Sequence, residues 1–441
     1  MAKRLRRAGD RKLIAAIDAG ASKAACVIAR LEPVGDGRTE AEIVGVGQYG
    51  APRRPVRGGA AGAAQTDDHD ETETAMRAAI ECAERMAGAR AEAAFVAVSG
   101  RSLRSRRVGV EIETVGGCVT AEDVADCLKA GCDAAAGTGA GGDAALEAGV
   151  MALHAEPMRF LVDGEPCRGA PEGLAGDVLG AELLALTVRE SVAANWEASL
   201  NRCGLELEAV VAAPYVAADA MLVPDEKELG VVFLDVGARS TNVAVFERGA
   251  VVGCGAVKLG GEHVTRDVAQ IFGAPLADAE RIKTLYGGVM SSAGDEHRLI
   301  DFPQLGDPSE VARHPRAELC AVVAPRFDEI LEHAGVLADR LIGPGRSLRR
   351  AVLTGGASLT LGAREAAERT LGVKARLGRP ARLAGAPEAA SAPQFAVAIG
   401  VVQYAAKRRR GGAPSTPAVA AAAHAPAAWF GGVGAWLRQN F

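Results

Sequence analysis

The chain has 441 residues, of which 49% are hydrophobic and 24% are charged, and its formal net charge at pH 7 is -5. This length exceeds the size at which a single hydrophobic core stops growing, so we expect at least two domains. The nearly balanced charge gives no reason to expect nucleic acid as a partner. Nine cysteines without a C-x-x-C pair predict reduced, buried thiols and no disulfides or zinc site.

The first predicted element is a hairpin at 13–31, LIAAIDAGASKAACVIARL, in which an apolar strand, an Asp-x-Gly turn and a second apolar strand follow one another. Asp18 and Lys23 interrupt the apolar run, so a signal peptide or a membrane span does not fit this segment. Residues 231–249, VVFLDVGARSTNVAVFERG, repeat the same plan. The sequence therefore predicts one hairpin used twice.

Helical and strand patterns alternate in the residues around these hairpins. Residues 71–88 have a helical pattern, and so do residues 120–136, which open with a capping box of Thr120 and Asp123. Apolar runs at 93–100 and 209–218 are typical of buried strands. This alternation predicts a layered α/β architecture.

The turns of the two hairpins carry residue types that suit a nucleotide. An Asp at a strand end, followed by Gly, a small residue and Ser or Thr, offers backbone N–H groups and a hydroxyl to phosphate oxygens. If Asp18 and Asp235 face one another, they could hold Mg²⁺ together with a nucleotide, and Lys23 could reach the phosphates. Each hairpin alone is better explained as an ordinary glycine turn, but the duplication favours the nucleotide.

Two later segments add weaker signals. Residues 351–362, AVLTGGASLTLG, predict a strand that runs into paired glycines, where the backbone can approach a flat or phosphorylated ligand closely. In residues 276–288, LADAERIKTLYGG, Glu280 and Lys283 share a helical face. Without context, that pair is best explained as a solvated salt bridge.

Taken in order, these four elements resemble the nucleotide motifs of the actin, sugar-kinase and heat-shock-chaperone superfamily. Within it, the chain resembles the bacterial cell-division FtsA family from about Lys12 to Phe441. The stretches that carry this resemblance are the first hairpin, residues 201–237, residues 255–288, the glycine loop and the C-terminal WLRQNF. The match is specific because nucleotide motifs and a division-protein tail occur in one chain.

The resemblance implies an α/β fold of the actin-like, two-lobed kind, with duplicated ribonuclease-H-like domains around an ATP cleft. It also implies an FtsA-type inserted subdomain, a flexible linker and a C-terminal amphipathic helix. The expected ranges are 12–92 and 177–214 for the first-lobe core, 93–176 for the inserted subdomain, 215–261 and 350–406 for the second-lobe core, 262–349 for its outer subdomain, 407–428 for the linker and 429–441 for the helix.

The same resemblance assigns the nucleotide contacts residue by residue. It implies that phosphate, Mg²⁺ and purine contacts come from both lobes, with the metal bound through water by Asp18 and Asp235. The implied contacts are Asp18, Gly20, Ser22 and Lys23 from one side, Asp235, Gly237, Arg239 and Ser240 from the other, Glu280 and Lys283 at the purine or ribose, and Gly355, Gly356 and Ala357 under the adenosine.

The second hairpin departs from the family pattern, because Ala238 and Arg239 stand where glycines are usual. Their side chains should crowd the turn if its backbone needs a positive φ, although Arg239 could instead add charge toward phosphate. No residue is identified that would position an attacking water. We therefore expect ATP to act mainly as a structural or switch ligand, with weak or absent hydrolysis.

Bulky side chains of the C-terminal tail recur at helical spacing, which is typical of a helix that lies flat at a membrane surface. Three glycines make this segment a poor helix in water, so we expect it to fold on lipid. Any attraction to anionic lipid would have to come from the basic residues 407–410. The alternative is a helix that docks on the protein's own surface. The expected membrane residues are Trp429, Phe430, Val433, Trp436, Leu437 and Phe441.

The function implied by the resemblance is a tether that attaches the division polymer FtsZ to the cytoplasmic face of the bacterial inner membrane at the septum. The FtsZ C-terminal peptide would dock on the outer subdomain, where residues 314–334 resemble the docking helix and Arg316 keeps a basic position. Ala321 replaces a residue that is often acidic. Filament formation with copies of itself and recruitment of later division proteins are further implications.

Two other classes stay open. A PilM-like component of a pilus assembly would share the fold and the nucleotide site but would not need the tryptophan-rich tail. A small-molecule kinase or a chaperone ATPase of the same superfamily would need a substrate pocket or a peptide-binding domain with real turnover, and the tail has no role in either.

Overall fold

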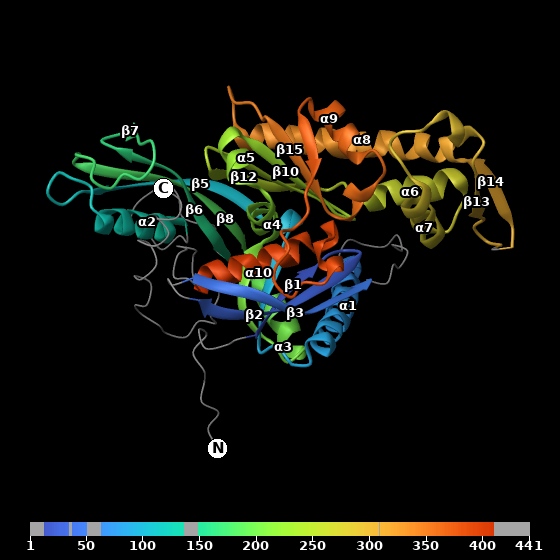
Figure 1. The fold of residues 1–441 in the computed structure, drawn as a ribbon, viewed down its shortest axis with the longest axis horizontal. Helices are drawn as coiled ribbons and strands as arrows, with labels where there is room; N and C mark the ends of the chain where they lie inside the picture. Colours follow the sequence, from blue (N-terminus) through green and yellow to red (C-terminus); the bar gives the residue numbers. More distant parts are fainter. Residues whose placement is uncertain (1–12, 35–37, 51–62, 136–148, 308, 410–441) are drawn as a thin grey trace, which may run out of the picture.

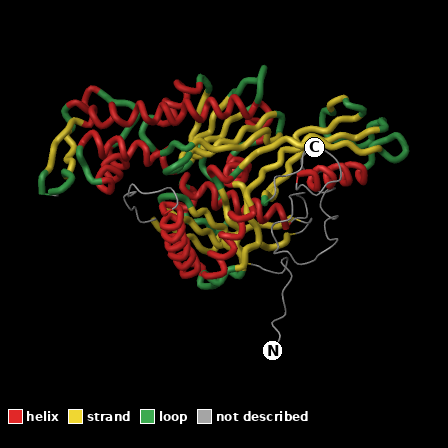
Figure 2. Tube along the Cα trace, turned by 180° about the vertical axis from the view of Figure 1, so that it is seen from behind, coloured by secondary structure: helices red, strands yellow, loops and turns green. Residues whose placement is uncertain are grey.

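The computed structural model describes residues 13–34, 38–50, 63–135, 149–307 and 309–409. Two lobes, each built on a five-stranded sheet, form the centre of the molecule (Figure 1). A β-rich subdomain and a mainly helical one extend to opposite sides, as the view from behind also shows (Figure 2). The expected linker from 410 onward and the tail helix at 429–441 lie outside the described residues.

The first-lobe sheet has the strand order β3-β2-β1-β4-β9, with β1 antiparallel to β2 and parallel to β4. Every residue of β4 is buried, which explains its uninterrupted apolar sequence. Helices α1 and α3 belong to the same lobe. Its elements are β1 (Leu13–Ala19), β2 (Lys23–Val34), β3 (Arg38–Gly50), α1 (Ala63–Ala87), β4 (Ala93–Val98), α3 (Glu190–Arg202) and β9 (Glu206–Ala212).

The second-lobe sheet repeats this plan with the order β12-β11-β10-β15-β16, again with an antiparallel hairpin beside a parallel neighbour. The repeat confirms the duplication predicted from the two hairpins and establishes the actin-like two-lobed fold. Its elements are α4 (Ala213–Met221), α5 (Pro224–Leu229), β10 (Val231–Val236), β11 (Thr241–Glu247), β12 (Ala250–Val257), β15 (Arg350–Thr354), α9 (Ala363–Leu371) and β16 (Lys374–Leu377).

The inserted subdomain is a four-stranded sheet of order β5-β8-β6-β7 covered by one helix. The predicted capping box is confirmed, since Thr120 N–H donates to Asp123 Oδ2 over 2.8 Å and Asp123 N–H donates to Thr120 Oγ1 over 3.1 Å. The elements are β5 (Arg104–Glu113), α2 (Ala121–Ala135), β6 (Val150–Val162), β7 (Glu165–Pro166) and β8 (Val178–Arg189).

The boundaries of this subdomain differ from the predicted 93–176. Strand β4 pairs with β1 and so belongs to the first-lobe core, and β8, expected in that core, pairs with both β5 and β6. The apolar sequence of β4 shows that it is buried but not which sheet buries it.

The outer subdomain of the second lobe contains a helical pair, a small hairpin and a long helix. Stacked Phe272 and Phe302, with ring centroids 4.3 Å apart, join the helices to the hairpin. The elements are α6 (Gly261–Phe272), α7 (Leu276–Tyr286), β13 (Leu299–Pro303), β14 (Val311–Pro315) and α8 (Arg316–Ile342).

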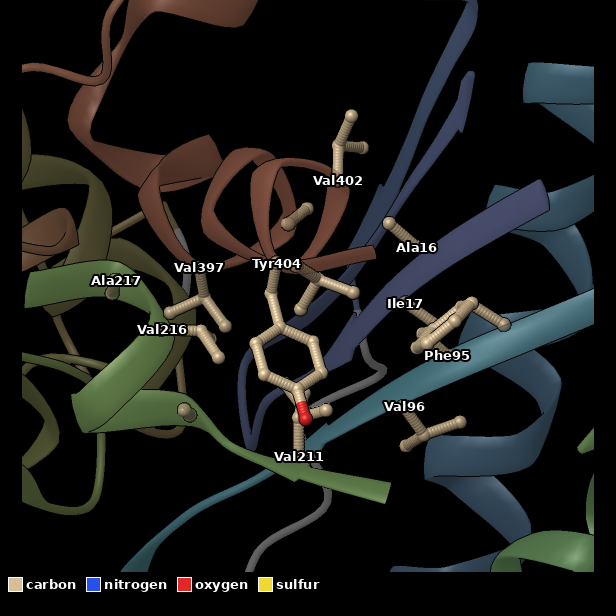
Figure 3. Close-up of a cluster of buried hydrophobic side chains, with 14 of the residues drawn as sticks. Ala16, Ile17, Phe95, Val96, Val211, Val216, Ala217, Val397, Val402 and Tyr404 are labelled. Atoms are coloured by element: carbon tan, nitrogen blue, oxygen red, sulfur yellow. The ribbon is translucent and has the colours of Figure 1, made fainter. Parts of the chain in front are cut away.

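Helix α10 (Ala396–Arg409) was expected in the second-lobe core but packs on the first lobe. Figure 3 shows Val397, Val402 and Tyr404 of this helix beside residues of β1, β4, β9 and α4. The helix also continues past the predicted linker start at 407. Lys407 forms an ion pair with Asp219, so part of the basic run expected to attract lipid is used inside the protein.

All nine cysteines are free thiols. The expectation that all of them are buried is wrong for four, since Cys118 is exposed and Cys82, Cys167 and Cys203 are only partly buried. Within the described ranges, no helix has the length and apolar character that crossing a membrane requires.

Candidate functional site

The turns of the two hairpins have the same hydrogen bond. In the first hairpin, Gly20 N–H donates to the Lys23 carbonyl oxygen over 2.9 Å, and in the second, Gly237 N–H donates to the Ser240 carbonyl oxygen over 3.0 Å. Each bond closes a short turn immediately after the strand that carries the aspartate. The two Asp-x-Gly sequences therefore fold into equivalent turns.

Both turns open into one pocket between the lobes. Its wall includes four of the implied contacts from the first hairpin and four from the second, together with the paired glycines after β15. The lining residues are Asp18, Gly20, Ala21, Ser22, Lys23, Ser99, Ala213, Asp235, Gly237, Ala238, Arg239, Ser240, Asn242, Gly355, Gly356, Pro393, Gln394 and Val397.

The pocket gathers two carboxylates and one ammonium. Burial, reinforced by the charge of Asp235, raises the pKa of Asp18 to about 7, although Lys23 opposes this shift. Burial also raises the pKa of Asp235, against the stabilising effects of Asn242 and Lys23, and it lowers the pKa of Lys23. The two acids disfavour each other's ionisation, so the site favours a ligand that brings positive charge.

The glycine loop after β15 is shaped by contact with the second hairpin. Gly355 has φ +85°, and a Cβ at this position would lie 2.4 Å from Asp235 Oδ1 and 2.6 Å from the Val236 carbonyl oxygen. A Cβ added to Gly356 would meet no atom within 4 Å. The first glycine is therefore required by packing, whereas the second leaves one side of the pocket open.

Among the described residues, no group of three or more His, Cys, Asp or Glu side chains could enclose a metal ion. Asp18 and Asp235 alone could still hold a Mg²⁺ ion that keeps most of its waters and shares phosphate oxygens, which is the usual arrangement in nucleotide sites.

Comparisons with known proteins identify the family. A family model described as cell division protein FtsA matches residues 232–400. The cell division protein FtsA of Rhizobium meliloti is 34% identical over 403 residues, covering 89% of this chain and 87% of the relative. The chain belongs to the FtsA family. The FtsA of Pseudomonas aeruginosa is 30% identical over 410 residues, covering 91% of each chain.

Among solved structures, a chain of the PilM-PilN type IV pilus biogenesis complex is similar, with a TM-score of 0.59 at 14% identity over 89% of this chain and 98% of that chain. At this identity the likeness shows a shared fold alone. The sequence relatives, and not this structural likeness, therefore assign the chain to the FtsA proteins.

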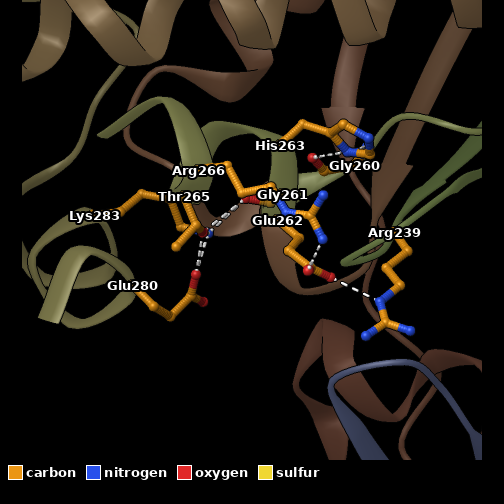
Figure 4. A network of polar contacts seen from close by, with 9 residues as sticks. All are labelled: Arg239, Gly260, Gly261, Glu262, His263, Thr265, Arg266, Glu280 and Lys283. Carbon is orange, nitrogen blue, oxygen red and sulfur yellow. Dashed lines mark hydrogen bonds and ion pairs between the residues drawn. The ribbon is translucent and has the colours of Figure 1, made fainter. Parts of the chain in front are cut away.

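The departure from the FtsA pattern at 238 and 239 does not strain the turn, because neither residue has a positive φ. Arg239 forms an ion pair with Glu262 over 2.9 Å, and Arg266 bonds the other oxygen of the same carboxylate over 2.7 Å (Figure 4). Burial opposes the ionisation of Glu262, but these two bonds lower its pKa overall. The guanidinium of Arg239 is thus partly committed within the second lobe.

Three other implied contacts lie outside the pocket lining. Lys283 Nζ donates to Glu280 Oε2 over 2.7 Å, to Thr265 Oγ1 over 2.9 Å and to the Gly261 carbonyl oxygen over 2.9 Å (Figure 4). Ala357 packs near Gly261, where an added Cβ would lie 3.2 Å from the Ala357 Cβ. The Glu280–Lys283 pair therefore braces α7 against the start of α6 in this structure.

Arg316, the residue expected at the docking surface, makes its observed contacts within this FtsA chain. It is 6% exposed, its Nη1 bonds Asp295 Oδ2 over 2.5 Å, and its Nε donates to the Tyr286 carbonyl oxygen over 2.8 Å. Backbone and side-chain bonds from Ser292, together with the Arg316 bond, lower the pKa of Asp295 to about 2. Arg316 therefore forms a buried ion pair with Asp295 at the start of α8, and its part in docking a partner stays a prediction.

Sequence reasoning missed several residues of the pocket wall. Ser99 follows β4, Pro393 and Gln394 lie in a short 3-10 turn before α10, and Val397 lies in the first turn of α10, so only the fold brings them to the hairpins. Asn242 is different, because its position opposite Asp235 follows from the hairpin itself. Counting residues across the turn could have identified it.

Proposed function

We propose that the pocket between the two hairpins binds ATP with Mg²⁺ and that the nucleotide sets the state in which this FtsA protein assembles. The observation that supports the proposal is the meeting of two equivalent Asp-x-Gly turns, one from each lobe, at a single pocket. The phosphates would lie between these turns, and the adenosine would extend along Gly355 and Gly356.

The donor set fits such a ligand. Ser22 and Ser240 supply hydroxyls, Lys23 supplies an ammonium, and the two aspartates supply oxygens of the kind that Mg²⁺ prefers. When bound, Mg²⁺ would neutralise phosphate charge. It would also remove the mutual repulsion of Asp18 and Asp235, because two buried carboxylates that share a cation can both ionise.

We further propose that ATP serves mainly as a switch between assembly states, with weak or absent hydrolysis. A ligand held by both lobes binds best when the lobes are close, so it shifts the population toward that arrangement. Filaments of this chain would then array many weak membrane tails on one surface, and multivalency would convert weak binding into firm attachment.

The cellular role that we propose is to tether FtsZ to the inner face of the membrane at the division septum and to recruit later division proteins. Membership of the FtsA family supports this role. The aromatic stripe of the tail, which includes Trp429 and Trp436, supports attachment as a peripheral protein. The docking site for the FtsZ peptide would lie on the exposed surface of the outer subdomain, and Arg316 would contribute only by holding α8 in place.

Liposome flotation tests the tether. The full-length protein and a chain ending at Ala428 are each mixed with liposomes, Mg-ATP and FtsZ, and a full-length variant with Trp429→Ala and Trp436→Ala serves as a second, less drastic change. We expect FtsZ to float only with the unchanged full-length protein. Flotation of the protein without FtsZ would point to another membrane-associated system, and flotation of the shortened chain would refute the role of the tail.

A further inference from the structure

Asn242 makes a contact that spans the two lobes at the pocket. It is 5% exposed, and its Nδ2 donates to Asp235 Oδ2 over 3.0 Å. At the other end of the same amide, Oδ1 accepts the backbone N–H of Gly100 over 3.2 Å. One side chain therefore joins a second-lobe carboxylate to the first-lobe backbone.

The first-lobe end of this link lies at the pocket wall. Gly100 opens a short 3-10 turn (Gly100–Ser102) directly after Ser99, which lines the pocket, and β4, which pairs with β1. A Cβ on Gly100 would have Ser240 Oγ of the second hairpin 4.0 Å away. The end of β4 and the turn of the second hairpin are thus close neighbours, and the hydrogen bond between Gly100 and Asn242 joins them.

The chemistry of the link requires a primary amide. Asparagine can donate at one end and accept at the other, whereas an ionised aspartate can only accept and an alanine can do neither. In the register of the second hairpin, Asn242 stands directly opposite Asp235. The equivalent position of the first hairpin, opposite Asp18, is Ala25, which makes no such bond.

We propose that Asn242 is a positioning residue that ties closure of the two lobes to the orientation of Asp235. This inference rests on the proposed function, because it assumes that Asp235 faces the metal of Mg-ATP. When the lobes are close, the Gly100 N–H fixes the amide, and the amide fixes the carboxylate. When they move apart, the bond to Gly100 breaks and Asp235 loses the support that orients it.

The link makes closure and ligand binding reciprocal. A Mg-ATP complex that orders Asp235 also orders Asn242 and so favours the bond to Gly100, and closure of the lobes favours ligand binding by the same factor. The amide of Gly100 should therefore exchange with solvent more slowly when Mg-ATP is bound. That change is a direct readout of the link.

The test compares full-length Asn242→Ala and Asn242→Asp with the unchanged chain. Thr241→Val is the matched control, because Thr241 is an equally buried neighbour whose Oγ1 donates to the Leu259 carbonyl oxygen over 2.9 Å within the second lobe. Two quantities are measured, the Mg-ATP dissociation constant and hydrogen exchange of a peptide spanning residues 99–103 with and without Mg-ATP.

Asn242→Ala should weaken Mg-ATP binding about 10-fold or more, as expected for the loss of a hydrogen bond to a charged group, and should abolish the slowing of exchange at 99–103. Asn242→Asp keeps the size of the side chain and the oxygen that accepts the Gly100 N–H, but it loses the donor to Asp235. It should therefore weaken Mg-ATP binding while retaining part of the slowing of exchange at 99–103. Thr241→Val should lower the melting temperature but leave both readouts unchanged.

The outcomes separate this inference from the proposed function. If the unchanged chain does not bind Mg-ATP, the proposed function fails. If it binds, and either Asn242 variant that folds binds equally well with the same slowing of exchange, the positioning role is overturned. An equal loss of affinity in Thr241→Val would also overturn it, because general damage to the second lobe would then explain the result.

Discussion

The first hairpin, β1–β2, and the second, β10–β11, bring the same turn to the pocket from opposite lobes but surround it with different charges. Lys23 in the first hairpin lies close enough to both aspartates to favour their ionised forms. Arg239, the cation of the second hairpin, forms an ion pair with Glu262. The first hairpin therefore supplies a positive charge to the pocket, whereas the second pairs its positive charge within its own lobe.

The hairpins also differ in the residue that pairs with the aspartate on the neighbouring strand. Asp18 has a methyl side chain opposite, that of Ala25, and Asp235 has the amide of Asn242. The parallel neighbours also differ, since a Cβ added to Gly100 after β4 would meet no atom closer than 4.0 Å, whereas one added to Gly355 after β15 would lie 2.4 Å from Asp235 Oδ1. The two hairpins therefore share a backbone plan but differ in the groups that surround their aspartates.

The largest effect should come from Asp235→Ala. This change removes the carboxylate that is held by Asn242 and faces Asp18, so we expect Mg-ATP affinity to fall about 100-fold or more, in line with the loss of one partner of a buried charged contact. Calorimetric titration with Mg-ATP measures the effect. Affinity within a factor of three of the parent would mean that the second hairpin does not hold the metal.

The next effect concerns the two glycines that follow the parallel strands. Gly355→Ala adds a Cβ 2.4 Å from Asp235 Oδ1 at φ +85°, whereas Gly100→Ala meets no atom closer than 4.0 Å at φ +74°. We expect Gly355→Ala to cost about 3 kcal/mol of unfolding free energy, from strain plus overpacking, and Gly100→Ala about 1 kcal/mol from strain alone. Urea denaturation without nucleotide checks the difference, and equal costs would contradict the packing argument.

A smaller effect of defined sign is expected for Asp18→Asn. Asp18 has its pKa raised from 3.8 to about 7 in the folded protein. The folded state therefore holds this proton more tightly than the unfolded chain, and ionisation costs stability as pH rises through that interval. The amide avoids this cost, so the variant should be about 1–2 kcal/mol more stable than the parent at pH 8, with a smaller gain at pH 5.5.

Denaturation at the two pH values, with and without Mg-ATP, measures this prediction. Mg-ATP should reverse the order, because the parent gains a metal ligand that the amide lacks. A gain that is the same at both pH values would show that Asp18 is already ionised in the free protein.

The smallest effect should come from Arg239→Ala. Its guanidinium side chain is 40% exposed and bonds Glu262, and exposed pairs of this kind contribute about 1 kcal/mol or less. We expect Mg-ATP affinity to change less than about 3-fold, against about 10-fold for Lys23→Ala, whose ammonium is held among the carboxylates. Calorimetric titration with Mg-ATP compares the two variants. A larger loss of affinity for Arg239→Ala would show that this side chain turns to the phosphates in the complex.

The two hairpins were predictable because their signals are local, whereas the two-lobed fold was expected from the resemblance to the FtsA family. Each Asp-x-Gly hairpin is specified within about 20 residues by apolar strands and a short turn, and the glycine loop is specified in the same way. The capping box at Thr120 is equally local, and it forms as predicted. Features that depend only on residues close together in the sequence were therefore predicted from it.

The remaining features depend on contacts between distant residues. Nothing near Arg316 shows that Asp295 will bury its charge, because the two come together only when α8 packs on the turn before β13. The same holds for Lys283, whose partner Thr265 lies on another helix. The sequence around a basic residue on a predicted helix does not show whether its side chain is exposed to solvent or buried in an ion pair.

The position of α10 has a consequence for the order in which a ribosome can finish this protein. The first-lobe core includes Val397, Ile399 and Tyr404 from this helix, and β3 is bonded at its edge by the Ala384 carbonyl oxygen, which accepts the Ile43 N–H over 2.8 Å. The lobe that emerges first thus cannot cover the face of its sheet that α10 packs on until nearly all of the described chain has been made. During synthesis that apolar face must stay open to water or to a chaperone until α10 has emerged.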